Sequence, residues 1–176
     1  MIVLDVPYYS QRDNYRDADR TCFSSACAMA LSYLRPRIIT GDDDYVREVF
    51  KRGDSIHSWI QIQVLKHFGI TASFSQRENN DTMMSQINKG IPVPCGILHR
   101  GPGYHPNGGG HWICVIGYDD KGWIVHDPWG EIDHASGTYV SQNGESLHYS
   151  YNLMDYRWTV AGISDGWSIV IDDKRK

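Results

Sequence analysis

The stretch His111-Trp112-Ile113-Cys114-Val115-Ile116-Gly117-Tyr118 carries most of the information about the fold. After its first residue it is almost wholly apolar, and a run of this length and composition predicts a buried β-strand. The stretch follows residues 101–110, which contain five glycines and two prolines and predict a long flexible loop. His111 therefore opens a buried strand beside a flexible loop, the most suggestive setting among the eight histidines of the chain.

Asp127 lies 16 positions after His111 and ends a second apolar run, residues 123–127. The two runs predict an antiparallel hairpin, and the position of its turn decides whether the two side chains meet. A turn centred on Asp119 would place them directly opposite each other on one face. The stronger turn signal, Asp120-Lys121-Gly122, keeps them on one face but offsets them along the strands. Contact would then require a bulge or a strong twist.

The rest of the chain divides into a helical first half and a second half of strands. A strongly apolar helix is predicted from Cys22 to Leu34, ended by Pro36. Further helices are predicted over residues 45–51, 56–68 and 81–90. Further strands are predicted over residues 91–98, 139–141, 146–149, 157–161 and 167–171, with Asn143-Gly144 as a hairpin turn. This order predicts an α+β fold, with N-terminal helices packed on a C-terminal antiparallel sheet, in a single domain of residues 1–176.

The composition is that of an ordinary globular protein. It is 41% hydrophobic and 22% charged with a formal net charge of −4, which argues against disorder and gives no support for nucleic-acid binding. No apolar run approaches the roughly 20 residues needed to span a bilayer. The N-terminus lacks the basic start and long apolar core of a signal peptide. We therefore expect no membrane span and a cytoplasmic location until release.

Cys22 stands at the predicted start of the first long helix, where unpaired backbone amides favour a thiolate. A cysteine in this setting is a nucleophile when a histidine acts as its base and a third group orients that histidine. His111 and Asp127 are our candidates for these two groups. The side-chain amide of Gln11 is the kind of donor that stabilises an oxyanion beside the Cys22 backbone N–H. The remaining cysteines fall inside predicted elements and are expected to be small buried apolar groups: Cys27, Cys95 and Cys114.

Two clusters raise the question of a metal ion, and for each we favour another interpretation. Asp42-Asp43-Asp44 precedes a predicted helix, where an acidic N-cap suits the helix dipole, and a cation site is the alternative. His105, His111 and His126 lack the spacing of metal ligands. The four cysteines form no Cys-x-x-Cys pair, so neither a zinc ribbon nor a disulfide scaffold is expected. We predict no metal and no cofactor.

The run from His111 to Tyr118, followed by Asp127-Pro128-Trp129-Gly130, resembles the His and Asn/Asp half of papain-like cysteine peptidases. It is similar in particular to the bacterial branch related to the double-glycine leader peptidases of bacteriocin export. Val6-Pro7-Tyr8-Tyr9-Ser10-Gln11, followed by a cysteine at a helix start, resembles the opening of that branch. Gly90-Ile91-Pro92-Val93 resembles the beginning of the strand before its histidine. The resemblance covers about residues 4 to 130 in the same order.

This resemblance implies a papain-like fold and a cysteine endopeptidase. It makes Cys22 the nucleophile, His111 the general base and then acid, Asp127 the group that orients the imidazole, and Gln11 a part of the oxyanion hole. The family commonly has Cys-Gly-Pro at the nucleophile, whereas this chain has Cys22-Phe23-Ser24-Ser25. The bulk of Phe23 lies where a substrate is expected to approach closely, which bears on substrate preference more than on the chemistry.

Tryptophans flank the proposed base and orienting group, and we expect Trp112 and Trp129 to wall the site. Trp158 and Trp167 have no assigned role.

Two substrate classes are compatible with the sequence. One is the peptide stem or cross-bridge of bacterial peptidoglycan, cut by a phage-type endolysin or wall hydrolase, and the other is a leader peptide cut at a double-glycine site. The lack of a membrane span and of a signal peptide favours the wall substrate. A third possibility is a catalytically silent peptide-binding domain, against which the presence of both Cys22 and His111 argues. An anionic wall would be met by a local basic face, for which the candidates are Arg12, Arg16, Arg20, Arg35 and Arg37.

Overall fold

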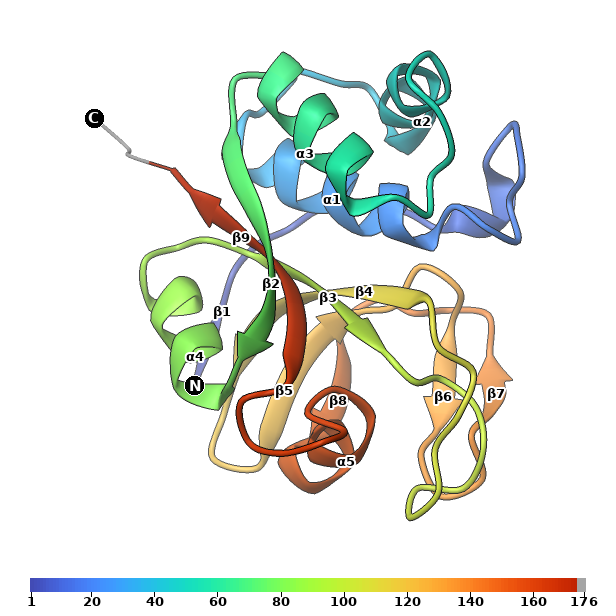
Figure 1. Cartoon of the computed structure of the whole chain (residues 1–176), viewed down its shortest axis with the longest axis vertical. Coiled ribbons are helices and arrows are strands. Elements are labelled where there is room, and N and C mark those ends of the chain that lie inside the picture. Colours follow the sequence, from blue (N-terminus) through green and yellow to red (C-terminus); the bar gives the residue numbers. More distant parts are fainter. Residues whose placement is uncertain (174–176) are drawn as a thin grey trace.

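The computed structural model describes residues 1–173, whose helices gather on both sides of a twisted antiparallel sheet (Figure 1). Helices α1 (Cys22–Leu34), α2 (Asp42–Phe50) and α3 (Ser58–His67) lie together at the top of the view. Helices α4 (Asn80–Asn88) and α5 (Tyr151–Arg157) lie in the lower part. The α+β fold predicted from the sequence is confirmed. None of the helices within residues 1–173 is both long and apolar enough to cross a membrane.

The main sheet has the strand order β2-β9-β3-β4-β5-β8, with β1 paired to β4, and all of these pairs are antiparallel. A separate hairpin consists of β6 and β7. The bounds of the strands are β1 Ile2–Val3, β2 Thr71–Glu78, β3 Val93–Ile97, β4 His111–Tyr118, β5 Gly122–His126, β6 Glu131–Asp133, β7 Thr138–Ser141, β8 Leu147–Ser150 and β9 Gly166–Asp172.

Strand β4 is central because both of its faces are buried. Cys114 and Ile116 pack into the cluster formed with α1, while Ile113 and Val115 pack into the cluster on the opposite face. Burial on both faces explains why the sequence of β4 is continuously apolar instead of alternating. Because β4 is the strand most firmly enclosed, the residue that opens it, His111, has a well-defined position.

Helix α1 is the most buried helix, with residues 22–31 all buried. It packs against β4 and β3 and also contacts α2 and α3. A helix that is apolar on all sides requires partners all round, which this position supplies. The first residue of α1 is Cys22, so the core of the protein also positions that side chain.

The prediction that the first half is wholly helical is wrong at β2 (Thr71–Glu78). This strand lies at the edge of the sheet and pairs with β9 alone. Its one large apolar residue is Phe74, and its side chains are partly or fully exposed. An edge strand with mostly polar residues lacks the apolar pattern by which strands are recognised.

Two predictions for the C-terminal part are also wrong. The strands on either side of Asn143-Gly144 do not pair with each other, because β7 pairs with β6 and β8 pairs with β5. The predicted strand from Arg157 to Ala161 does not form, since Arg157 ends helix α5. The Ser150 side chain caps this helix by accepting a hydrogen bond from the backbone N–H of Leu153.

Candidate active site

The structure brings His111 and Asp127 into direct contact. His111 Nε2 and Asp127 Oδ1 are 2.8 Å apart, and both side chains are buried. The register pairs Cys114 with His126, so His111 and Asp127 are offset along their strands, and a bulge follows Val115. The turn runs from Asp119 to Gly122, so the register lies between the two predicted ones, and the contact between the two side chains is accompanied by a bulge.

The Asp127 carboxylate is held by donors on both oxygens. The backbone N–H of Trp129 donates to Oδ1 at 3.0 Å, and the hydroxyl of Tyr149 donates to Oδ2 at 3.1 Å. The backbone of Asp127 is fixed as well, because its N–H donates to Gly144 O at 2.9 Å and its carbonyl accepts from the Tyr8 hydroxyl at 3.1 Å. A carboxylate with this many contacts holds its hydrogen-bond partner in one orientation.

The charge state of His111 follows from this contact. Burial lowers the pKa of His111, but the charge of the Asp127 carboxylate and its hydrogen bond outweigh burial, and a hydrogen bond to Cys22 adds to them, so the pKa rises to about 10. Since Nε2 faces Asp127, Nδ1 is the ring nitrogen left for Cys22. His111 is therefore an imidazolium at neutral pH, placed between a carboxylate and a thiol.

Cys22 is the first residue of α1, and its thiol donates to Gly110 O at 3.4 Å. The N-cap residue Thr21 makes no side-chain hydrogen bond to the helix, so the first-turn amides of α1 are not capped in that way. Gly110 directly precedes His111 in the chain. The end of the glycine-rich loop therefore lies beside the thiol and forms part of the site.

A buried polar network fixes the start of α1. The amide of Asn14 lies 2.9 Å from Thr21 Oγ1 and 3.0 Å from Ser25 Oγ, and Ser25 Oγ donates to Asp42 Oδ2 at 2.6 Å. Burial raises the pKa of Asp42 to about 6, while the Ser25 hydrogen bond opposes the rise. This network ties the first turn of α1 to α2, so that Cys22 is positioned by hydrogen bonds as well as by packing.

The acidic run of residues 42–44 does not form the N-cap proposed from the sequence. Asp42, Asp43 and Asp44 form the first turn of α2 itself, while Gly41 is the N-cap. Their charges lie at the positive end of the helix dipole, which is the physical reason given for them from the sequence. Within the described residues 1–173, no group of three or more His, Cys, Asp or Glu side chains is arranged to hold a metal ion.

Gln11 is buried between the segment that follows Asp127 and the loop that precedes Cys22. Its backbone N–H donates to Pro128 O at 2.9 Å, directly after Asp127, and its side-chain Nε2 donates to Ala18 O at 2.7 Å, in the loop before Cys22. An amide NH₂ has two hydrogens, and Ala18 uses one of them. The second hydrogen is the one required for an oxyanion hole, so that role stays a prediction.

A cleft of about 290 Å³ opens beside Cys22. Aromatic rings from five elements line it: Phe23 of α1, Trp59 of α3, Phe74 of β2, Trp112 of β4 and Trp167 of β9. The ring of Phe23 stacks on Trp112 at 3.6 Å and is 2% exposed, so it forms the floor of the cleft and does not project across it. The expectation that Trp112 walls the site agrees with this position.

A second cleft of about 340 Å³ adjoins the first. The two share Gly110, Trp112 and Trp167 as a common wall. Trp167 had no assigned role from sequence and is 46% exposed at this wall. Trp158 is buried and donates to Trp167 O at 3.0 Å, so it supports that wall from behind.

The remaining candidates lie away from the thiol or have structural roles. His126 is buried, with Nε2 2.8 Å from Val6 O, and it accepts from Ser146 N–H at 3.0 Å through Nδ1. His105 is exposed in the glycine-rich loop. Trp129 contacts Asp127 through its backbone, and its ring lies under the Arg12 guanidinium. Cys27, Cys95 and Cys114 are fully buried, and burial raises the pKa of all three thiols.

Three residues at the site were missed from the sequence. His99 stacks on the His111 ring with centroids 4.7 Å apart, and Tyr139 of β7 lies edge-on to both. Tyr149 of β8 donates to Asp127. No local sequence signal marks these positions, because their proximity depends on the pairing of β5 with β8 and on the placement of the β6–β7 hairpin.

Comparison with solved structures shows the same fold at low sequence identity. A double glycine motif protease from an AMS/PCAT transporter, determined in complex with a leader peptide, has a TM-score of 0.60 and 12% identity over 96% of this chain and 92% of that one. A putative C39-like peptidase from Bacillus anthracis has a TM-score of 0.56 and 16% identity over 100% of both chains. The peptidase domain of Streptococcus ComA, a bi-functional ABC transporter involved in a quorum-sensing pathway, has a TM-score of 0.54 and 16% identity over 99% and 100%.

No curated protein matches the sequence. The model of the Peptidase_C39 like family matches residues 3–157, which include the cysteine, histidine and aspartate of the candidate site. The papain-like fold inferred from the sequence and its similarity to the double-glycine peptidase branch are therefore confirmed. This chain belongs to the Peptidase_C39-like family.

Proposed function

We propose that this chain is a cysteine endopeptidase that hydrolyses peptide bonds through Cys22, His111 and Asp127. The main support is the buried 2.8 Å contact between His111 Nε2 and Asp127 Oδ1, which leaves the other ring nitrogen for a cysteine at a helix start. A thiol, an imidazole and a fixed carboxylate in this order are the components of nucleophilic acyl transfer. A catalytically silent peptide-binding domain would not need them.

In the proposed reaction, Cys22 Sγ attacks the carbonyl carbon of the scissile bond as a thiolate. The carbonyl oxygen becomes an oxyanion, which accepts hydrogen bonds from the Cys22 backbone N–H and from the second hydrogen of the Gln11 amide. His111 then gives its proton to the leaving amine, and the C–N bond breaks to leave a thioester on Cys22. A water molecule, deprotonated by His111, attacks the thioester and releases the carboxylic acid and the thiolate.

As substrate we propose peptide stems or cross-bridges of bacterial peptidoglycan. Support comes from the cleft beside Cys22, which has about 290 Å³ and is bordered by Trp112 and Phe74. A double-glycine site has no side chains to occupy such a cleft, whereas most bonds in stem peptides are flanked by side chains. Phe23, which replaces the glycine common after the nucleophile in this family, also sets this chain apart from the leader peptidases.

Leader peptides cut at a double-glycine site are the second candidate substrate. They are favoured by one observation, the similar double glycine motif protease that binds a leader peptide. The electrostatic argument for a wall substrate is weak, because several of the candidate arginines are paired with carboxylates. These ion pairs join Arg16 to Asp17, Arg20 to Asp54 and Arg35 to Asp173.

A digest with two substrates tests the proposal. Purified peptidoglycan from several bacterial classes and a synthetic double-glycine leader peptide are incubated with the wild-type protein and with Cys22→Ser, and the fragments are identified by mass spectrometry. We expect new termini from peptidoglycan with the wild type and none with Cys22→Ser. Cleavage of the leader peptide alone would replace the wall substrate with the second candidate. Equal activity of the wild type and Cys22→Ser would contradict the proposed mechanism.

A further inference from the structure

His99 lies against the proposed general base on the side that neither Asp127 nor Cys22 occupies. Its ring is nearly parallel to that of His111, with an interplanar angle of 25° and centroids 4.7 Å apart. His99 Nδ1 lies 3.1 Å from the hydroxyl of Tyr139, whose ring is edge-on to both imidazoles. The two side chains thus form a wall along the face of the His111 ring.

We propose that His99 is a positioning residue, which holds the His111 ring in the plane needed for proton transfer with Cys22 while Tyr139 holds His99. The proposal rests on the function proposed above. Asp127 holds one atom of the imidazole, Nε2, and a hydrogen bond at that atom does not by itself fix the plane of the ring. A flat group stacked on the ring face removes this freedom and excludes water from the Asp127 contact.

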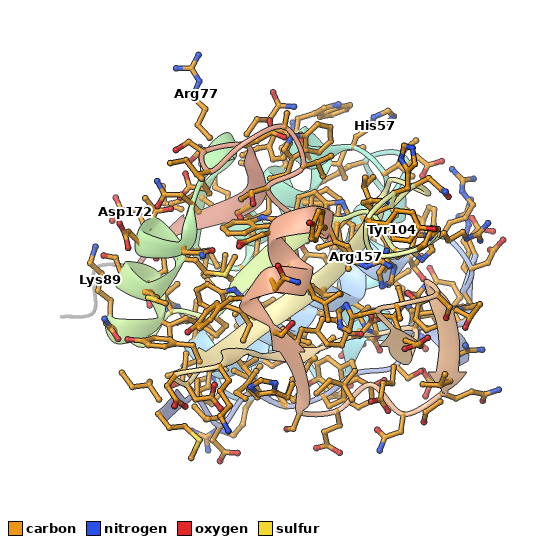
Figure 2. All side chains as sticks on the ribbon, turned by 90° about the horizontal axis from the view of Figure 1, so that it is seen from below. His57, Arg77, Lys89, Tyr104, Arg157 and Asp172 are labelled. Atoms are coloured by element: carbon orange, nitrogen blue, oxygen red, sulfur yellow. The ribbon has the colours of Figure 1, made fainter. Side chains whose placement is uncertain are left out.

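Arg157 fixes the backbone that carries this wall. Its guanidinium donates to the carbonyls on both sides of His99, Leu98 O at 3.0 Å and Arg100 O at 3.1 Å. It also donates to Gly101 O at 2.8 Å and to His134 O at 2.9 Å, which lies between β6 and β7. Figure 2 shows Arg157 among the packed side chains, whereas Arg77 projects outward. One buried side chain therefore ties the segment of His99 to the hairpin of Tyr139.

Burial, and then the charges around it, keep His99 neutral, so that it does not repel the imidazolium of His111. Burial lowers the pKa of His99 to about 3, and the positive charges of His111, Arg100 and Arg157 act in the same direction, against the carboxylate of Asp127. A protonated His99 would repel His111 at stacking distance. A neutral ring gives the same contact without that repulsion.

The test uses two readouts that need no known substrate. One is the titration of the His111 ring followed by NMR of ¹⁵N-histidine-labelled protein, and the other is the rate of Cys22 alkylation by iodoacetamide at pH 7. The variants are His99→Leu, which removes the flat ring, His99→Phe, which keeps it, and Tyr139→Phe, which removes the hydroxyl. His148→Leu is the matched control, because His148 contacts Asp119 on the exposed side of β8.

We expect His99→Leu to lower the His111 titration midpoint by about one pH unit and the alkylation rate about fivefold. His99→Phe and His148→Leu should resemble the wild type, and Tyr139→Phe should change both quantities less than His99→Leu does. A lower thermal stability with an unchanged midpoint and rate in His99→Leu and Tyr139→Phe would overturn the proposal. If His99→Leu fails to fold, Tyr139→Phe decides. An unchanged His111 midpoint and an unchanged alkylation rate in Tyr139→Phe would then overturn the proposal.

The same data separate this proposal from the proposed function. A wild-type His111 that titrates near 6.5, together with a Cys22 no more reactive than free glutathione, would contradict the peptidase mechanism itself. An activated wild-type pair that is indifferent to His99 and Tyr139 would contradict the positioning role alone.

Discussion

The Asp127 carboxylate determines the pH range in which His111 can act. Burial alone would make His111 neutral, and the carboxylate reverses this and raises the pKa of the imidazole to about 10. Because the folded-state pKa is raised, the stabilisation from this contact is complete below the unfolded-state value near 6.5 and is lost as the pH rises through about 10. The proton for the leaving amine is available over the same range.

The first prediction concerns the pH dependence of activity. The alkaline limb of kcat/KM should lie close to pH 10 in the wild type. In Asp127→Asn the limb should move to lower pH, because burial then acts on His111 without an opposing charge. The measurement is a pH–rate profile with any peptide that the wild type cleaves. An identical alkaline limb in both proteins would show that Asp127 does not set the ionisation of His111.

The second prediction compares two substitutions. Asp127→Ala should lower kcat by about 10²-fold, and His111→Ala should lower it by at least ten times more. The surrounding groups, among them His99 and Tyr139, still restrict the imidazole when the carboxylate is lost. His111 is the imidazole hydrogen-bonded to Cys22, so its loss removes the proton acceptor itself. Equal losses in two correctly folded variants would mean that Asp127 does more than orient His111.

The third prediction concerns Gly144, which lies over the backbone of Asp127. A Cβ at this position would collide with the Asp127 carbonyl oxygen and approach the Tyr8 hydroxyl. Gly144→Ala should therefore displace Asp127 and lower kcat about tenfold or more, even in a folded protein. Gly41→Ala is the control, since nothing lies within 4 Å of its Cβ position. Unchanged kinetics in Gly144→Ala would show that the segment after Asp127 tolerates movement.

Individual residues of the site differ in how far the sequence reveals them. Cys22, His111 and Asp127 can be proposed because each falls at the boundary of an element with a strong apolar pattern. Asn143-Gly144 is also visible, but as a turn signal, and its actual use is the close approach to Asp127. His99 has no such signal, since its contact with His111 depends on how the glycine-rich loop folds back.

At the level of elements, the sequence predicts best those whose burial is complete, and it misses the edge strand β2 and the helix α5. Helix α1 and strand β4 are enclosed on all sides, so their residues are continuously apolar and their bounds are predictable. The edge strand β2 and the helix α5 are partly exposed and carry weak patterns. The β6–β7 hairpin depends on long-range packing against the site, which local propensity does not encode.

The fourth prediction concerns the link that α5 makes with the site. Arg157 is fully buried and donates to four backbone carbonyls. Arg157→Met should lower the free energy of unfolding by about 3 kcal/mol, because buried carbonyls lose their donors. Urea unfolding measures the change, and Arg77→Met, on an exposed side chain, should stay within about 0.5 kcal/mol of the wild type. A similarly small change in Arg157→Met would contradict this role.

At the scale of the whole molecule, the site lies where the helical group meets the sheet. Cys22 comes from α1 and His111 from β4, and the cleft beside them is bordered by residues of α3 and β9 as well. Trp59 of α3 and Trp167 of β9 are 54% and 46% exposed at this cleft. Large apolar side chains exposed around a cavity are typical of a binding surface. That the whole chain acts as one domain of residues 1–176 stays a prediction.

The fifth prediction follows from this arrangement. Trp59→Ala should raise KM for a cleaved peptide by about fivefold and leave kcat within about twofold, because Trp59 borders the cleft without contacting the reacting groups. Ile38→Ala removes another exposed apolar side chain, outside the lining of the cleft, and should change neither constant. A loss confined to kcat in Trp59→Ala would place this residue in the chemical step.

In the proposed mechanism, Cys22 and His111 together cleave peptide bonds. The most direct measurement is the digestion of a diverse peptide library and of purified peptidoglycan by the wild type, Cys22→Ala and His111→Ala, with new termini identified by mass spectrometry. We expect new termini with the wild type and none above background with either variant, while circular dichroism shows that all three are folded. Intact substrates with a folded wild type, or equal cleavage by Cys22→Ala, would contradict it.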